Sequence, residues 1–114
     1  MVVPLMQRQR NFRFEVERVM LVRTATLKDG RSYVHRCTLE TLREVAWWIE
    51  EHGADGVTTN ELWDALPDLP ATQISVALEF LKERGCMATR GRRNYPASSA
   101  LYEDAMVEYH ALEA

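Results

Sequence analysis

The N-terminal third of the chain carries the pattern of β-strands. Apolar and polar residues alternate over 12–19, which is the period of a half-buried strand. Residues 20–27 are rich in types that favour strands, and Asp29-Gly30 is a strong hairpin turn signal before a return strand over 32–37. Because Glu and Arg are frequent in the same stretch, a single helix over 12–27 is the alternative. The pattern predicts a hairpin or a strand pair.

The apolar spacing becomes helical after residue 37. A helix is predicted over 38–52, since Thr38 can cap its start and Gly53 suits a C-terminal residue with positive φ. Residues 58–61, Thr-Thr-Asn-Glu, form a capping box, in which the first hydroxyl and the last carboxylate each accept a backbone N–H of the other residue. This second helix is expected to end before Pro67.

Two further helices and a second hairpin complete the pattern. A third helix is predicted over 71–84, with a core stripe of Ile74, Ala77, Leu78 and Leu81. Residues 86–97 predict two short strands around a turn that contains Arg90, Gly91, Arg92 and Arg93. A last helix is predicted from Ser98 or Ser99 to residue 112, with an apolar stripe of Leu101, Ala105, Tyr109 and Leu112, widened by Tyr102 and Met106. At 114 residues the chain has the size of one domain.

The order of helix, capped helix, tight turn, helix and short basic hairpin resembles the winged helix-turn-helix superfamily. The most similar part is 58–95, in which 71–84 matches the recognition helix and 86–97 matches the wing. The resemblance implies an α+β, mainly α, winged helix-turn-helix with an N-terminal β-hairpin or strand pair and an added C-terminal helix. Within this single domain, 1–37 would be an arm and hairpin packed on the winged-helix core and C-terminal helix of 38–114.

Charge is strongly segregated along the chain, although the formal net charge is only −3. Residues 1–37 carry eight basic and three acidic groups, and 86–97 carry three basic groups and no acid. In contrast, 38–85 carry three basic and ten acidic groups, and 98–114 carry four acidic groups without Lys or Arg. A nucleic-acid binder needs a local basic surface rather than a basic total, and only the first two segments could supply one.

The resemblance implies binding to double-stranded DNA by a transcriptional regulator, with the recognition helix in the major groove and the wing on the backbone. The nucleic-acid-binding residues assigned in this way are Thr72, Gln73, Arg90, Arg92, Arg93 and Asn94. Other groove-facing positions depart from the usual polar pattern, since Val76, Glu79, Phe80 and Glu83 are apolar or acidic. This outer face also suits a protein-docking winged helix without sequence-specific DNA binding, which is the alternative function.

A second phosphate patch is a further hypothesis for the N-terminus. Arg8, Arg10 and Arg13 are interleaved there with Phe12 and Phe14. The alternative is a disordered tail followed by an edge strand that is guarded by charge.

The last helix has an apolar face wide enough to need covering, while its other face is acidic. Winged-helix regulators often dimerise through such added helices, and a two-fold protein suits palindromic DNA. The resemblance therefore implies a homodimer, with an interface of Trp47, Leu101, Tyr102, Met106 and Tyr109. A monomer in which the last helix caps the core is the alternative. For Trp47 alone, burial beneath the chain's own N-terminal hairpin is the simpler interpretation.

Motifs for catalysis and metal binding are absent from the sequence. There is no nucleophile elbow, no Gly-rich phosphate loop and no cysteine beside an obvious base, so we expect a binding module and not an enzyme. His35 and Cys37 are one weak pair, whereas zinc sites usually show two, so neither a metal nor another cofactor is predicted. No apolar run approaches about 20 residues, so no membrane association is expected. Cys37 and Cys86 fit reduced thiols in a cytoplasmic protein.

Overall fold

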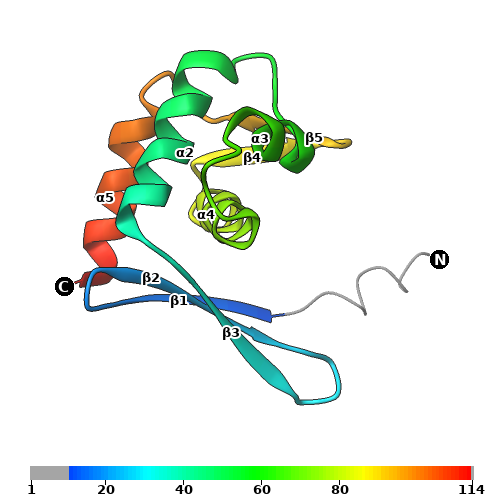
Figure 1. Cartoon of the computed structure of the whole chain (residues 1–114), viewed down its shortest axis with the longest axis vertical. Coiled ribbons are helices and arrows are strands. Elements are labelled where there is room, and N and C mark those ends of the chain that lie inside the picture. Colours follow the sequence, from blue (N-terminus) through cyan, green and yellow to red (C-terminus); the bar gives the residue numbers. More distant parts are fainter. Residues whose placement is uncertain (1–10, 114) are drawn as a thin grey trace.

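The computed structural model describes residues 11–113 and shows an α+β fold. In chain order the elements are β1 (Asn11–Glu17), β2 (Met20–Thr26), β3 (Ser32–Cys37), α2 (Leu39–His52), α3 (Thr59–Ala65), α4 (Ala71–Glu83), β4 (Met87–Arg90), β5 (Arg93–Pro96) and α5 (Leu101–Glu113). The strands form two antiparallel sheets, ordered β1-β2-β3 and β4-β5. Figure 1 shows α4 between the two sheets, with α2 and α5 side by side along one flank. Within 11–113, we find no helix with the length and apolar character needed to cross a bilayer.

The N-terminal sheet has three strands, one more than the predicted hairpin or strand pair, and the helical alternative for 12–27 is wrong. β2 pairs with both neighbours, and the β2–β3 turn contains Gly30 in a left-handed conformation. β1 and β2 are joined by a tight turn at Arg18 and Val19, which have φ values of 50° and 72°. The sequence does not signal this turn, because Arg-Val lacks the Asn or Gly that such turns prefer.

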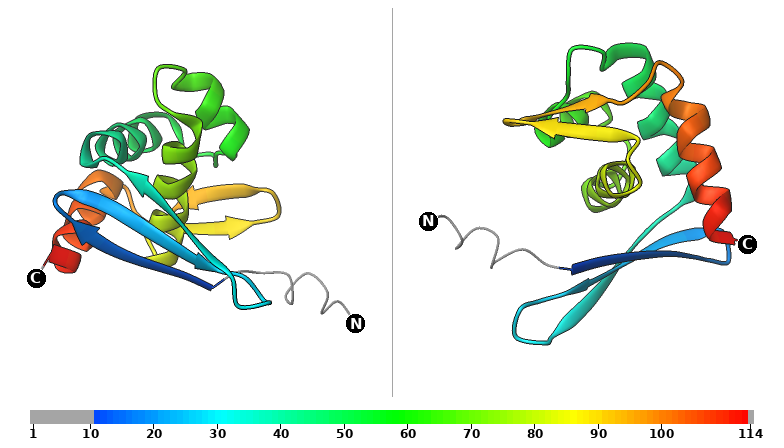
Figure 2. Two further views of the ribbon diagram at one scale, coloured as in Figure 1. Left: turned by 60° about the horizontal axis from the view of Figure 1, so that its bottom comes forward. Right: turned by 180° about the vertical axis from the view of Figure 1, so that it is seen from behind.

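Side chains along each strand point alternately to the two faces of this sheet. Phe14, Leu21 and Cys37 share the inner face and are buried in the core. In both views of Figure 2, α4 separates this sheet from the β4–β5 hairpin. The inner face of the sheet therefore supplies a second wall of the core, opposite the helices.

The helix ends agree with the predicted caps. At the start of α2, Thr38 Oγ1 accepts a hydrogen bond from the Thr41 N–H, and both halves of the Thr58–Glu61 capping box are present at α3. The predicted positive φ of Gly53 is wrong, because its φ is −100°. A Cβ on Gly53 would lie 2.8 Å from the Ile49 carbonyl oxygen, so a close backbone approach is what requires glycine here.

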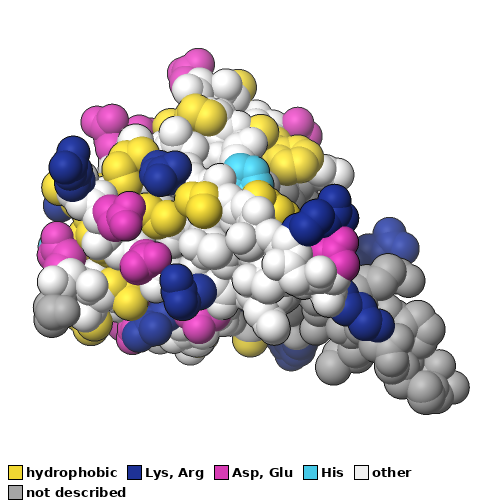
Figure 3. Space-filling model, turned by 90° about the horizontal axis from the view of Figure 1, so that it is seen from below, with side chains coloured by type: hydrophobic (Ala, Val, Ile, Leu, Met, Phe, Trp, Pro, Cys, Tyr) yellow, Lys and Arg dark blue, Asp and Glu magenta, His cyan; other side chains and the backbone are white. Residues whose placement is uncertain are grey.

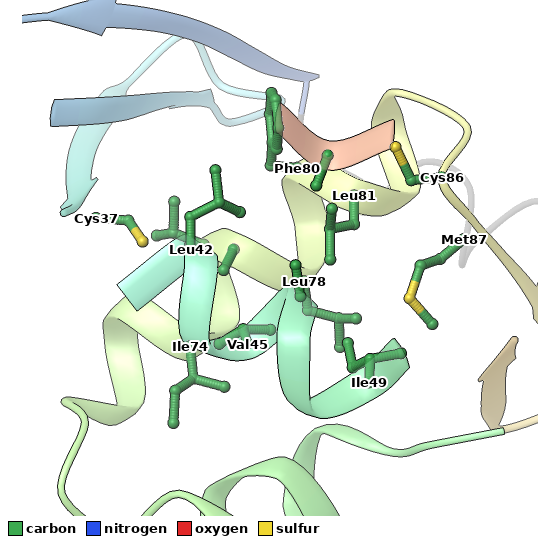
Figure 4. Packing of buried hydrophobic residues seen from close by; sticks show 14 of the residues in the cluster. Cys37, Leu42, Val45, Ile49, Ile74, Leu78, Phe80, Leu81, Cys86 and Met87 are labelled. Atoms are coloured by element: carbon green, nitrogen blue, oxygen red, sulfur yellow. The ribbon is translucent and has the colours of Figure 1, made fainter. Parts of the chain in front are cut away.

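Helix α4 is buried on two sides. Its predicted core stripe of Ile74, Ala77, Leu78 and Leu81 is buried, as the helical spacing indicates. Val76 and Phe80 on the neighbouring side are also fully buried, and the Phe80 ring meets the Phe14 ring at a centroid distance of 5.5 Å. Figure 4 shows Phe80 on the side of α4 nearest the N-terminal sheet. Since burying one such side chain contributes about 1.5–3 kcal/mol, this second side holds the sheet firmly on α4.

Helix α5 packs within its own chain, on α2 and β1. Leu101, Ala105 and Tyr109 are its buried residues, which confirms the predicted stripe for these positions. The Tyr109 hydroxyl donates a 2.6 Å hydrogen bond to the Val19 carbonyl oxygen, 90 residues away in the sequence. This bond ties the last helix to the turn between β1 and β2.

The β1–β2 turn generates a prediction of stability. Val19 is β-branched, 56% exposed and held at a positive φ that L side chains rarely adopt. Val19→Gly should raise the free energy of unfolding by about 0.5–1 kcal/mol, because relief of the strain exceeds the added backbone entropy of glycine. Urea denaturation measures the change. Val34→Gly is the matched control, because Val34 is exposed on β3 with an ordinary strand backbone, and it should destabilise the fold. A loss of stability in Val19→Gly would contradict the strain.

The two thiols generate a prediction of reactivity. Cys37 and Cys86 are free and buried, and burial raises the pKa of Cys37 to about 12 and the pKa of Cys86 to about 11. Both are therefore protonated at neutral pH, whereas the thiolate is the reactive form. A thiol-labelling reagent should modify neither cysteine in the folded protein and both after unfolding, as measured by intact mass. Fast labelling of either thiol in the folded protein would show that the site opens or that its thiol is accessible.

Candidate nucleic-acid interface

Helices α3 and α4 and the β4–β5 hairpin form the candidate interface. The Trp63 indole N–H donates to the Ala71 carbonyl oxygen at 3.2 Å, which links the two helices across their connecting turn. Beyond α4, Gly85 has a φ of +81° and leads the chain into β4. The face of α4 that stays open carries Thr72, Ser75, Glu79, Lys82 and the exposed Glu83, which we call the outer stripe. Its Glu79 and Lys82 form an ion pair of 3.5 Å.

Two predicted groove-facing residues of α4 do not face outward. Val76 and Phe80 are fully buried, because the N-terminal sheet covers that side of the helix, so their assignment to the groove is wrong. Their apolar character was the signal of a second buried face. Gln73 is half-buried, and its side-chain oxygen accepts from the Thr38 N–H at 3.1 Å, which joins α4 to the start of α2. Thr72 is exposed, as the prediction for this site requires.

The β4–β5 hairpin presents two arginines to solvent. Arg90 and Arg92 are exposed, and the Arg90 guanidinium lies over the Tyr95 ring at 4.3 Å from its centroid. Within 11–113, neither arginine forms an ion pair with a carboxylate. We call Arg90 and Arg92 the hairpin arginines. They are the part of the predicted basic wing that is available to a ligand.

The remaining two predicted wing residues are engaged in the fold. Arg93 Nη2 donates to the Gly56 carbonyl oxygen and to Glu61 Oε1, both at 2.8 Å. Asn94 is 6% exposed; its amide nitrogen donates to the Val57 carbonyl oxygen, and its amide oxygen accepts from the Thr89 hydroxyl. The assignment of Asn94 to nucleic acid is therefore wrong, because its side chain is buried and hydrogen-bonded. It holds the hairpin on the loop before α3.

The structure does not bring together the basic residues of the second phosphate patch within 11–113. Arg8 and Arg10 lie outside the described residues, and Arg13 forms an ion pair of 3.8 Å with Glu15. Figure 3 shows the side of the molecule that carries the N-terminal sheet, where Lys and Arg side chains are interspersed with Asp and Glu. Mixed charge of this kind gives little net attraction for phosphate.

The predicted dimer interface separates into two groups. Leu101 and Tyr109 are fully buried within their own chain, so they cannot contact a second chain, and this part of the prediction is wrong. Tyr102 and Met106 are half-buried, and Trp47 is 52% exposed. Because the apolar face of α5 is covered by α2 and β1, the original reason for a homodimer is removed. A homodimer stays a prediction that would have to use Trp47, Tyr102 and Met106.

Trp47 borders an aromatic groove rather than lying beneath the N-terminal sheet. Its ring meets the Tyr102 ring edge to face, with centroids 5.3 Å apart, and Trp48 and Leu66 line the same groove of about 540 Å³. The expected burial under the hairpin is wrong, because the sheet packs on α4 instead. Trp48 is packed at the edge of the core, while Trp63 is 39% exposed.

Glu61 connects the helix cap to the hairpin electrostatically. The Thr58 backbone N–H, followed by the Arg93 guanidinium, holds the pKa of Glu61 below its ordinary value. The carboxylate thus satisfies the α3 capping box and the hairpin together. The sequence indicates the first role by the Thr-x-x-Glu spacing, but the second requires the hairpin to fold back on α3.

Sequence reasoning missed Ser75 of the outer stripe and Arg23, and it noted Lys82 only as an exposed base near the end of the helix. Because Val76 is buried, the exposed face that includes Thr72 continues along the helix on the side of Ser75 and Lys82, at spacings of three and four residues. Arg23 stands between Leu21 and Ala25 on inward positions of β2, and that placement is the signal that could have found it. In the described range, His, Cys, Asp and Glu form no cluster of three or more that could hold a metal ion. Comparisons with protein-family models, with curated proteins and with solved structures give no match.

The Glu61 contacts generate a prediction of pH dependence. A carboxylate with a lowered folded-state pKa stabilises the fold above its ordinary pKa, and this contribution is lost as the pH falls through the folded-state value. Glu61→Gln should therefore lower the free energy of unfolding at about pH 7 and have little effect at about pH 3. Urea denaturation at the two pH values gives the comparison. Glu51→Gln on the exposed face of α2 is the control, and a similar loss in both variants would contradict the role of Glu61.

Proposed function

We propose that this chain is a duplex DNA-binding module of the winged-helix kind that serves in transcription regulation. The observation that carries the proposal is the pair of exposed hairpin arginines, without a carboxylate partner in 11–113, beside a helix pair joined by a tight turn. Arginines without an ion pair are free to neutralise phosphates, which is the main source of sequence-independent affinity for DNA.

The hairpin presents its arginines on a rigid support. Arg93 and Asn94 fasten β5 to the loop before α3, and the cation–π contact with Tyr95 orients Arg90. A side chain that is already oriented loses less entropy when it binds. The arginines of the hairpin therefore divide their roles, since Arg90 and Arg92 would contact phosphate while Arg93 positions the hairpin.

Base recognition is the smaller part of the proposal. On the outer stripe, the Thr72 and Ser75 hydroxyls can donate to or accept from bases, and Glu79 can accept from a cytosine amine. Glu79 also repels phosphate, although Lys82 at 3.5 Å offsets its charge. We therefore expect affinity to come mostly from phosphate contacts and sequence preference to be modest.

A protein-interaction module without sequence-specific DNA binding is the second candidate, and the aromatic groove favours it. An exposed Trp is enriched at interaction hot spots, and Trp47 lines this groove together with Trp48, Leu66 and Tyr102, without a residue of the β4–β5 hairpin. The two candidates use different surfaces. They can thus be separated by substitutions on each surface.

Binding to a short mixed-sequence duplex, followed by fluorescence anisotropy over a series of salt concentrations, tests the first candidate. The natural chain should bind at low salt with a steep decrease in affinity as salt rises. Arg90→Ala/Arg92→Ala should weaken binding and reduce the slope of log K against log salt by about 0.9 for each phosphate that the variant no longer neutralises. Both residues are exposed, so the fold should be unchanged.

Two control variants make this experiment specific. Arg43→Ala removes a positive charge beside the aromatic groove, and Trp47→Ser removes the exposed ring of that groove. Both should bind duplex as the natural chain does. An unchanged slope in the double arginine variant would remove the hairpin from the interface. Absence of duplex binding at low salt would overturn the DNA proposal and leave the protein-interaction module.

A further inference from the structure

Arg23 is a buried arginine on the inner face of the N-terminal sheet. It lies in the middle of β2, in register with Phe14 on β1 and His35 on β3, and only 8% of the residue is exposed. An arginine side chain is always protonated in proteins. The sheet therefore holds a positive charge where a buried strand residue would normally be apolar.

The contacts of Arg23 leave its charge uncompensated within 11–113. Nη2 donates to His35 Nδ1 at 3.1 Å, and the guanidinium carbon lies 5.0 Å from the centroid of the Phe12 ring. Nε is buried without a hydrogen-bond partner, and no carboxylate of the described residues forms an ion pair with this arginine. Buried charges are normally paired, because an unpaired one carries a large desolvation penalty. One acceptor and one ring compensate it only in part.

The His35 ring supplies the acceptor that orients this guanidinium. Because Nδ1 accepts from Arg23, the proton of the neutral imidazole lies on Nε2, on the other side of the ring. His35 is half-buried, and its ring is packed edge to face against Tyr33 at a centroid distance of 4.9 Å. A guanidinium is a donor group that binds phosphate oxygens, and the acceptor at His35 Nδ1 holds the guanidinium of Arg23 in place.

Arg23 and the β4–β5 hairpin lie on opposite sides of α4. Its neighbour Phe14 packs on Phe80, and β3 packs along α4, so Arg23 lies on the sheet side of α4. The β4–β5 hairpin, which carries the hairpin arginines, lies on the opposite side of that helix, as Figures 1 and 2 show. A helix in the major groove has a phosphate backbone on each side of it, because that groove is about 12 Å wide.

We infer that Arg23 and His35 form a phosphate-binding subsite on the sheet side of α4. This inference rests on the proposed function and deepens it, since the ligand would be a backbone phosphate of the strand opposite the one held by the hairpin arginines. The same site would bind free inorganic phosphate, so the experiment must distinguish a DNA backbone phosphate from free phosphate. The N-terminal sheet then has a role beyond covering α4, because it carries the second half of a two-sided phosphate clamp.

Arg23→Met tests the subsite, because methionine retains much of the apolar length of arginine and removes the charge. Removing an uncompensated buried charge should leave stability unchanged or raise it, whereas duplex affinity should fall and the salt slope should decrease by about 0.9. A purely structural arginine would show the reverse, with reduced stability and an unchanged slope. Arg23→Lys retains the charge and should keep most of the slope. His35→Gln is the second variant and should also weaken duplex binding.

The His35 ring resonances, followed by NMR, identify the ligand. In the natural chain, addition of duplex should shift these resonances, and Arg23→Met should abolish the shift. A response to inorganic phosphate, compared with chloride at equal ionic strength, without any duplex binding would support the subsite, assign it to free phosphate and overturn the DNA proposal. If Arg90→Ala/Arg92→Ala changes the slope while Arg23→Met changes neither slope nor His35 resonances, this inference fails and the DNA proposal stands.

Discussion

The packing of α4 between two β-structures is the constraint on which the other features depend. One side of the helix, with Ile74 and Leu78, joins the core formed with α2, while the adjacent side, with Val76 and Phe80, receives the N-terminal sheet. The edge-to-face contact between Phe14 and Phe80 fixes where the sheet lies. The outer stripe is the side of α4 that this packing leaves uncovered, so the packing limits which side chains of the helix are accessible.

Polar contacts complete this arrangement by fixing the hairpin relative to the helices. Glu61 caps α3 and binds Arg93, and Asn94 bonds to the backbone at Val57. These contacts engage two of the residues that a sequence pattern assigns to DNA. The same contacts hold β4 and β5 against the loop before α3. Arg90 and Arg92 remain exposed on this hairpin. Within 90–94, the two exposed arginines are thus followed directly by the two residues that hold the hairpin in place.

The N-terminal sheet and α5 depend on one another in a similar way. The β1–β2 turn contains two residues with unfavourable positive φ, and Tyr109 from α5 bonds to the carbonyl oxygen of one of them. α5 is consequently engaged by its own chain along its apolar stripe. The aromatic surface that stays open is a different one, formed by Trp47 and Tyr102 where α2 and α5 meet.

Local interactions along the sequence determined the element types, because each is decided by neighbours within a few residues. Thr38 and the Thr58–Glu61 box start helices by binding nearby backbone N–H groups, and Asp29-Gly30 supplies the backbone conformation of a turn. The sequence by itself also indicated a basic hairpin over 86–97, because this segment contains three arginines and no acid.

Tertiary structure alone decided which faces are covered, because coverage depends on residues distant in the chain. The same helical spacing that places Val76 and Phe80 on a ligand-facing side also permits a second buried side, and only the position of the sheet selects between them. The turn at Arg18 and Val19 has no local signal, since its stabilising bond comes from a residue 90 positions later. Burial of Asn94 and of Arg23 follows from the docking of the hairpin and the sheet, respectively. The exposure of Trp47 is decided in the same way, because packing on α4 keeps the sheet away from it.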